Sequence, residues 1–306
     1  MKNIFITGGA GFIGSHVAAQ ALAQGFKVTV FDDLSVGRKS FLPKSRSLKF
    51  IKGDILNTAG LAAAIKRARP DVVIHLAAIH HIPTCERYPE RTMRVNIEGT
   101  QSVLRAAQGV KRIVFASTGA LYQDEDTLRE TTPKQPRDIY GFTKFACEQL
   151  LELHARRQPT QIVMGRLFNT VGPHETNQHI IPDILAQLVK GKRTIQLGNM
   201  NRYRDYVHVR DVARALLRLA TARVAKQFDV FNIGTGREHS VRDIVALCER
   251  YLGHSITVVQ SQLRVRKNDR LHQCANIRKI TTQLGWRPRQ TLADAIREMM
   301  AEQGLV

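Results

Sequence analysis

The sequence has few cysteines, and none of them form a recognisable pair. Its four cysteines lie at positions 85, 147, 248 and 274, without a CxxC motif. A disulfide framework or a zinc site needs several cysteines, or cysteines with histidines, at characteristic spacings. We therefore predict free thiols and no metal site.

Long apolar runs are also missing. No window approaches the roughly 20 apolar residues that a membrane-spanning helix requires. The first residues, MKNIFITGG, lack the charged and apolar segments of a secretory signal. With 43% apolar residues in 306, however, the chain can form a substantial core. We expect a globular, cytoplasmic protein with no membrane partner.

Acidic residues are scarce relative to basic ones, 26 against 46, which gives a net charge of +20. Such a charge attracts phosphate-rich partners such as nucleic acids or sugar nucleotides. The basic clusters, KRAR at 66–69 and RVRK at 264–267, are short, and there is no long basic tail. We favour a solvated basic surface over nucleic-acid binding, which the charge alone leaves open.

What the sequence does contain is a regular alternation of short β-branched stretches and amphipathic stretches. Strand and helix in alternation predict a parallel sheet with helices on both faces, an α/β fold of the Rossmann type. The predicted strands are 3–7, 27–31, 48–51, 72–76, 112–116, 161–167 and 228–234, and the predicted helices are 12–24, 58–67, 89–108, 139–157 and 240–252, the last capped by Ser240.

The alternation breaks after residue 167, where FNTVGPHETNQ is rich in Gly, Pro, Asn and Thr and predicts a loop. We therefore divide the chain into a larger domain, 1–168, and a smaller α/β domain, 169–306. No repeat or low-complexity segment is visible.

Glycines follow the first predicted strand in the pattern of a dinucleotide-binding turn. Gly8 or Gly9, Gly11 and Gly14 allow a tight turn, close approach of a pyrophosphate and close packing of the next helix. The second strand ends in Asp32, 21 residues after Gly11, where an acid binds ribose hydroxyls and repels a 2′-phosphate. The combination predicts NAD rather than NADP. Asp54, just past the third strand, is a candidate for the adenine amino group, although a simple loop acid fits nearly as well.

Tyr140 and Lys144 lie four residues apart at the start of a predicted helix, so their side chains share a face. A lysine ammonium near a phenol stabilises the phenolate, so we expect the pKa of Tyr140 to be lowered toward neutrality. Thr118, at the end of the fifth strand, would bring a hydroxyl to the same strand-end crevice.

Several motifs in order, TGGAGFIG, LAA (76–78), Asn96 in NIEGT, AST (116–118), YGFTK, RLFNTVGP, RDYVHVRD and NIGTG, resemble the extended short-chain dehydrogenase/reductase family, in its nucleotide-sugar epimerase and dehydratase branch. The resemblance extends over nearly the whole chain. It implies tightly bound NAD, a smaller domain that binds a nucleoside diphosphate sugar, and return of segments near 205–238 to the larger domain. The cofactor contacts it implies are Gly8, Gly11, Phe12, Ile13, Gly14, Asp32, Asp33, Asp54, Ile55, Leu76, Ala77, Ala78, Asn96, Ser117, Tyr140 and Lys144.

The resemblance also implies the chemistry. Tyr140 removes a hydroxyl proton from the sugar, most often at C4, while Thr118 hydrogen-bonds the reacting oxygen and NAD is reduced and then reoxidised. Family dehydratases and decarboxylases carry acids where this chain has Gly119 and Ala120, which favours a 4-epimerase acting on a UDP-linked hexose or hexosamine. Net oxidoreduction or dehydration of a sugar nucleotide is the alternative. A non-catalytic NAD-sensing or RNA-binding role ranks below both, because such relatives commonly lose the tyrosine and lysine.

The substrate contacts are assigned by the same resemblance. His80, in the distinctive stretch IHHIPTCERYP, would approach the sugar, and His81 beside it is a further candidate, but a loop histidine explains either equally well. The diphosphate and base would meet Asn169, His179, Arg204 and Arg266, with Asp269 completing an RxGD-like pattern, since guanidinium groups bind phosphate through paired hydrogen bonds. The family is often dimeric through helices matching 89–108 and 139–157, so we expect a homodimer.

Overall fold

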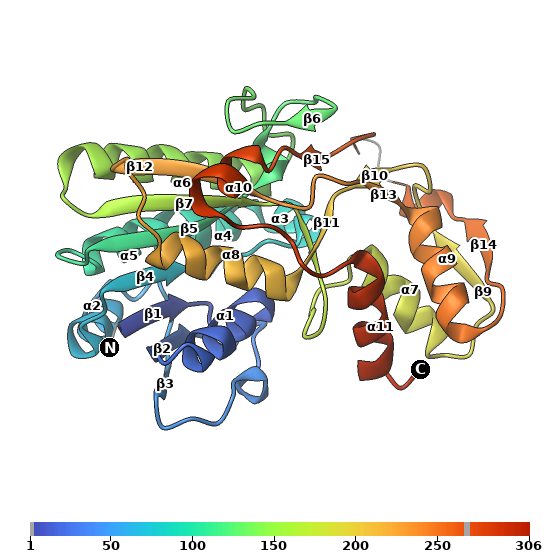
Figure 1. The fold of residues 1–306 in the computed structure, drawn as a ribbon, viewed down its shortest axis with the longest axis horizontal. Helices are drawn as coiled ribbons and strands as arrows, with labels where there is room; N and C mark the ends of the chain where they lie inside the picture. Colours follow the sequence, from blue (N-terminus) through green and yellow to red (C-terminus); the bar gives the residue numbers. More distant parts are fainter. Residues whose placement is uncertain (1–2, 266–269) are drawn as a thin grey trace.

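The central element is a parallel sheet of seven strands (Figure 1). The computed structural model describes residues 3–265 and 270–306. The spatial order is β12-β7-β5-β4-β1-β2-β3, and each neighbouring pair is parallel. The predicted Rossmann-type fold is therefore confirmed. The strands are β1 (Asn3–Thr7), β2 (Lys27–Asp32), β3 (Leu48–Lys52), β4 (Val72–His75), β5 (Arg112–Thr118), β7 (Gln161–Leu167) and β12 (Phe228–Ile233).

Helices cover both faces of this sheet, as the alternation of strand and helix predicts. In β1, Ile4 and Ile6 belong to one core cluster, whereas Phe5 between them belongs to another. This period of two means that both faces of the strand are buried, which is typical of a parallel sheet. The first face packs against α1 (Phe12–Ala23) and α8 (Val209–Thr221), and the second against α2 (Thr58–Ala68), α5 (Gly99–Ala106) and α6 (Ile139–Arg157).

The helix predicted over 89–108 is not continuous. The structure has α4 (Pro89–Met93), a π-helical turn η2 (Arg94–Glu98) and then α5. Asn96 lies in the π-helical turn and is buried. Such wide turns often occur near functional sites because they redirect one side chain. Here the buried amide of Asn96 contacts the loop after β4, a constraint that helical periodicity does not reveal.

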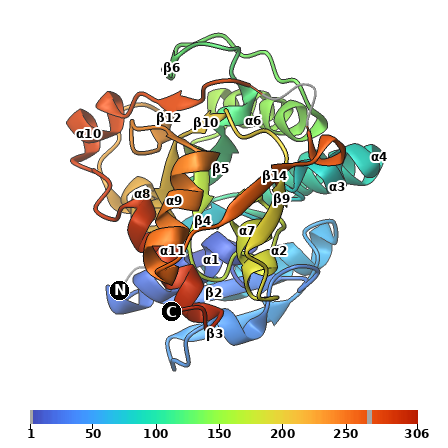
Figure 2. The same ribbon diagram turned by 90° about the vertical axis from the view of Figure 1, so that its right-hand side faces the viewer.

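A smaller unit extends from the carboxyl edge of the sheet (Figure 1 and Figure 2). It has its own apolar core, which includes Ile184, Ile195, Ile244 and Met299. Ser240 caps α9 through a capping box with Asp243, so the predicted cap is confirmed. The unit contains α7 (Ile180–Leu188), β9 (Thr194–Leu197), α9 (Val241–Leu252), β14 (Thr257–Gln260) and α11 (Leu292–Glu302).

The chain passes between the two units more than once. After β7 it leaves the sheet, returns as α8 and β12, leaves again, and returns as α10 (Arg278–Leu284), which packs beside β12. The division at residue 168 therefore describes only the first crossing, and the domain boundaries stay a prediction.

Short elements connect the two units. The stretch predicted as loop after residue 167 begins instead with β8 (Asn169–Val171), which pairs with β11 (Tyr206–His208), a partner too distant in sequence for local composition to indicate. None of the helices described is long and apolar enough to cross a membrane. The remaining elements are η1 (Lys39–Phe41), α3 (Ile82–Arg87), η3 (Gly119–Leu121), β6 (Thr127–Leu128), β10 (Tyr203–Arg204), β13 (His239–Ser240), η4 (Gln262–Arg264) and β15 (Cys274–Ala275).

Candidate active site

A cleft of about 1960 Å³ lies at the carboxyl ends of the sheet strands, between the sheet and the smaller unit. Open parallel sheets bind ligands at this edge, where the strand order reverses on either side of β1. The structure brings most of the predicted site residues together there. The lining includes Gly8, Gly11, Phe12, Ile13, Gly14, Asp32, Asp33, Asp54, Ile55, Leu76, Ala77, Ala78, His80, Ser117, Thr118, Tyr140, Lys144, Asn169, His179 and Arg204.

The glycine turn after β1 has no room for side chains. Gly8 has a φ of +70°, and a Cβ there would lie 2.6 Å from the backbone nitrogen of Ala77. A Cβ on Gly14 would collide with the Gly8 carbonyl oxygen. The close packing thus lets the backbone itself form this wall of the cleft, and α1 begins directly after it.

The residues of this turn fit a dinucleotide. Gly11 precedes α1, and no side chain caps the helix, so its first N–H groups and positive end are available to a pyrophosphate. Asp32, at the end of β2, accepts hydrogen bonds from Ala10 N and Leu34 N, both at 2.9 Å, and burial raises its pKa. A carboxylate oxygen accepts more than one hydrogen bond, so both oxygens retain capacity for ribose hydroxyls.

The other two predicted acids are engaged locally. Asp33 accepts hydrogen bonds from the backbone and hydroxyl of Ser35. Asp54 accepts one from Leu56 N at 2.9 Å. Both line the cleft while holding their own loops, so a ligand-binding role for either stays a prediction.

Tyr140, Lys144 and Thr118 meet at the centre of the cleft. Asp138 caps α6 by accepting a hydrogen bond from Gly141 N at 2.7 Å, which places Tyr140 in the first turn of the helix. Lys144 Nζ donates to Ala116 O at 2.8 Å and lies 5.9 Å from the Tyr140 ring centroid. The Thr118 side chain hydrogen-bonds that of Tyr140. A hydroxyl pair and an ammonium are therefore held together in the cleft.

The expected lowering of the Tyr140 pKa is wrong for the protein without ligands. Burial raises the pKa of Tyr140, and the hydrogen bond from Thr118 offsets only part of the effect. Burial also lowers the pKa of Lys144, to about 8. Removing water from both side chains penalises both charged forms, and the sequence spacing does not reveal this burial.

A buried hydrogen-bond network supports the strand end that carries Ser117 and Thr118. Ser117 Oγ donates to Glu148 at 2.6 Å, and Glu148 forms a two-point ion pair with Arg166 at 2.9 and 2.7 Å. Arg166 also contacts the Tyr122 hydroxyl at 2.8 Å. Such paired geometry satisfies charges that would otherwise be costly to bury.

Asn96 is not among the residues that line the cleft, and its assignment as a cofactor contact stays a prediction. Its Oδ1 accepts from Ile79 N at 2.8 Å, and its Nδ2 donates to Ile79 O and to the Thr143 hydroxyl, both at 2.9 Å. It is 2% exposed. Its side chain thus joins the loop before His80 to α6, so it positions the wall rather than forming it.

Another part of the cleft wall is formed by polar side chains from segments that are distant in the sequence. His80 and His179 both reach it, and their ring centroids are 6.3 Å apart. Arg204 lines the cleft and donates to the carbonyl oxygens of Tyr203 and Arg270. Asn169, on β8, is a further lining residue. Arg266 and Asp269 lie outside the described residues.

The sequence interpretation missed several lining residues. Glu175 and Asn177 come from the stretch expected to be only a loop, and Arg202 and Arg270 lie near predicted arginines. Arg270 is 8% exposed, donates to Ala120 O at 3.0 Å and lies 3.1 Å from an Asp124 carboxylate oxygen. The available signal was the polar pattern HETNQH, in which only His179 had been singled out.

The chain is similar to known proteins over most of its length. A family model described as "NAD dependent epimerase/dehydratase family" matches residues 4–234. UDP-glucose 4-epimerase of Halalkalibacterium halodurans is 32% identical over 94% of this chain and 90% of its own length. Among solved structures, UDP-glucose 4-epimerase from Brucella ovis in complex with NAD has a TM-score of 0.91 at 29% identity, covering 99% of both chains. The Thermotoga maritima enzyme with UDP-glucose has a TM-score of 0.90 at 30% identity, covering 99% of this chain and 100% of its own. On this evidence, together with the glycine turn and the Tyr140 and Lys144 pair, the chain belongs to the NAD-dependent epimerase/dehydratase family.

Proposed function

We propose that this protein is an NAD-dependent 4-epimerase of a UDP-linked hexose or hexosamine. The observation that carries the proposal is the meeting of Thr118, Tyr140 and Lys144 beside the glycine turn, in one cleft. A non-catalytic protein that only sensed NAD would not need a hydroxyl pair and an ammonium at this position. The names of the relatives and of the solved structures support the same reaction.

The three side chains divide the proton chemistry among them. NAD, when bound, supplies a reversible hydride acceptor for the sugar carbon. In its phenolate form, Tyr140 accepts the proton of the sugar hydroxyl and later returns it, and Thr118 orients the reacting oxygen through its hydrogen bond with Tyr140. Lys144, with a pKa of about 8, keeps its positive charge at neutral pH and stabilises the phenolate form of Tyr140.

The absence of acids at the end of β5 argues against elimination. The turn after Thr118 contains Gly119 and Ala120, and the space beside Gly119 is filled by the Phe168 ring, 3.1 Å from where a Cβ would lie. Elimination of water requires an acid and a base in addition to the tyrosine. The geometry therefore favours epimerisation over dehydration.

Proton NMR of UDP-glucose and UDP-galactose incubated with the purified protein tests this function. We expect either sugar to reach the same equilibrium mixture without added cofactor, because NAD copurifies and is regenerated in each cycle. NAD released by denaturing the gel-filtered protein checks that retention. Turnover only with stoichiometric NAD or NADH would instead assign net oxidoreduction and contradict the proposal.

We propose, further, that the protein is a homodimer. Phe142 and Leu153 on α6 and Tyr88 beside α4 are large side chains that are 47%, 46% and 51% exposed. Light scattering after gel filtration is expected to give twice the monomer mass, and Leu153→Lys is expected to shift the mass toward the monomer.

A further inference from the structure

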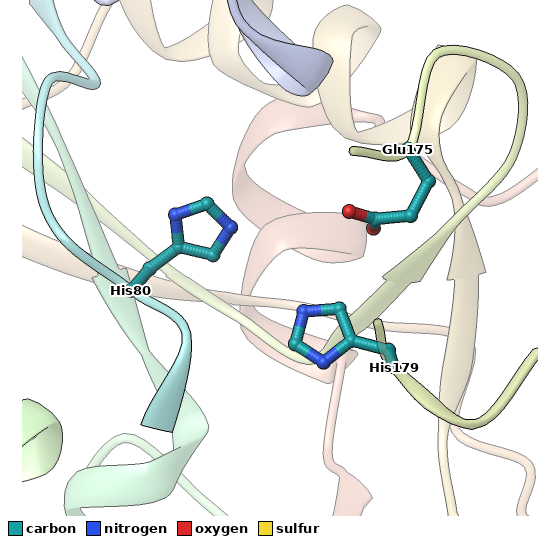
Figure 3. A group of neighbouring side chains, drawn as sticks. All are labelled: His80, Glu175 and His179. Atoms are coloured by element: carbon teal, nitrogen blue, oxygen red, sulfur yellow. The ribbon is translucent and has the colours of Figure 1, made fainter. Parts of the chain in front are cut away.

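Three metal-ligating side chains converge in the cleft. His80 follows β4, whereas Glu175 and His179 lie between β8 and α7. Their ligand atoms all lie within 4.8 Å of one another. Figure 3 shows the two imidazoles and the carboxylate turned toward a shared space from opposite segments. The Thr118, Tyr140 and Lys144 chemistry described above uses none of the three.

The surrounding contacts orient His80 toward this space. Its Nε2 lies 2.9 Å from Asn177 Nδ2. An amide nitrogen only donates, so His80 Nε2 carries a lone pair at this position. The ring also hydrogen-bonds the backbone of Ala78. A histidine ring that contacts backbone on one side and presents a lone pair on the other, here to the Asn177 amide, has the usual arrangement of a metal-binding histidine.

Glu175 is the acidic member of the group, and burial raises its pKa to about 7. Asn177 N donates to its Oε1 at 3.0 Å, which fixes the carboxylate in the loop. Among the described residues, no arginine or lysine forms an ion pair with Glu175. A partly buried carboxylate without a cationic partner gains stability from a bound cation.

We propose that His80, Glu175 and His179 bind one divalent transition-metal ion of the zinc class. Two imidazoles and one carboxylate suit zinc, cobalt or nickel, whereas magnesium and calcium prefer oxygen ligands alone. Tetrahedral bonds of about 2.0–2.1 Å place ligand atoms about 3.3 Å apart. The distances between the ligand atoms therefore shorten by about 1.5 Å at most when the ion binds. The Asn177 amide rotates away from His80 Nε2 in the same step.

The three protein ligands leave at least one coordination position open to the cleft. Because all three residues line the same cleft as Tyr140, and the Lys144 charge acts on His80, the bound ion is expected to occupy part of the space that we propose for the hexose. Zinc is therefore expected to act as a competitive inhibitor and to raise the KM for UDP-glucose. This one consequence rests on the proposed function.

The direct test is titration of the full-length, chelator-treated protein with Zn²⁺ in competition with a chromophoric chelator, without any sugar. We expect one ion per chain. His80→Gln, Glu175→Gln and His179→Gln are each expected to weaken binding by more than about tenfold. His254→Gln, which changes a histidine outside the cleft, is the matched control and is expected to bind zinc as the unchanged protein does.

Two further measurements separate this site from the alternatives. The absorption spectrum of the protein with Co²⁺ is expected to show the visible bands of nitrogen and oxygen coordination. Thiolate charge-transfer bands would instead assign the ion to cysteines and overturn the proposal. Asn177→Ala is expected to retain or tighten zinc binding, because the competing amide is gone. Equal binding by the three ligand variants and His254→Gln, or no stoichiometric binding, would also overturn it. Since these titrations need no turnover, their failure is distinguishable from failure of the epimerase proposal.

Discussion

The two ends of the cleft are built in different ways. The glycine end, residues 8–14 with Asp32 and residues 76–78, is formed by backbone at the ends of neighbouring strands. The histidine end, His80, Glu175, Asn177 and His179, is formed by side chains from two segments far apart in the chain. One end is therefore specified by where side chains are excluded, and the other by which side chains are present.

This difference determines how each end responds to substitution. At the glycine end an added methyl group meets backbone atoms that have no room to move, so loss of binding and loss of stability go together. At the histidine end the side chains are only partly buried, so their replacement changes ligand preference at little cost to the fold. The predictions below test this contrast.

The largest effect is expected where the two ends meet. Tyr140→Phe removes the phenolic oxygen that accepts the proton but keeps the ring, so epimerase turnover is expected to fall by up to about 10⁴-fold. NAD content after gel filtration is expected to be unchanged, since the glycine end is intact. NMR turnover and released NAD are the measurements. Retained turnover would remove Tyr140 from the proposed mechanism.

A comparison of two buried acids gives the next largest effect. Glu148→Gln leaves the buried Arg166 charge without its partner and is expected to cost about 3–5 kcal/mol of unfolding free energy. Asp205, near the smaller unit, accepts hydrogen bonds from the backbone of Thr235, Gly236 and Ala275. Asp205→Asn is expected to cost only about 1–3 kcal/mol, because it leaves unpaired dipoles rather than an unpaired charge.

Urea denaturation of both variants measures this difference. Glu148→Gln is also expected to reduce turnover, because Ser117 loses its carboxylate partner beside Thr118. Equal losses of stability in the two variants would contradict the importance assigned to the ion pair.

The glycine end is tested by Gly14→Ala. Its Cβ would collide with the Gly8 carbonyl oxygen, so we expect a loss of about 1–3 kcal/mol together with most of the bound NAD. Gly25→Ala is the control, because a Cβ there meets open space and only the φ of +78° is strained. It is expected to lose stability and keep its NAD. Full NAD retention by Gly14→Ala would show that the turn relaxes.

The same contrast explains what the sequence could predict. The strands, the parallel sheet and the glycine turn follow from local patterns, because apolar periodicity and glycine spacing act over neighbouring residues. The π-helical turn around Asn96 and the pairing of β8 with β11 depend on tertiary contacts, and so were not predicted. His80 and Asn177 are 97 residues apart, so no spacing rule brings them together.

The last prediction concerns Lys144, whose burial has opposite consequences for activity and stability. Burial lowers its pKa from 10.5 to about 8, so the ammonium is lost as the pH rises through 8. Turnover that depends on this charge is then expected to fall about tenfold for each pH unit above 8.

Between about 8 and 10.5 the unfolded chain binds a proton that the folded chain has released, so the stability contributed by this lysine rises with pH. Lys144→Met removes the titrating group. Its activity is expected to be low at every pH, and its stability is expected to lose the rise above pH 8, as pH–rate profiles and urea denaturation at pH 7 to 10 would measure. If the turnover of Lys144→Met also falls above pH 8, the titration belongs to another group.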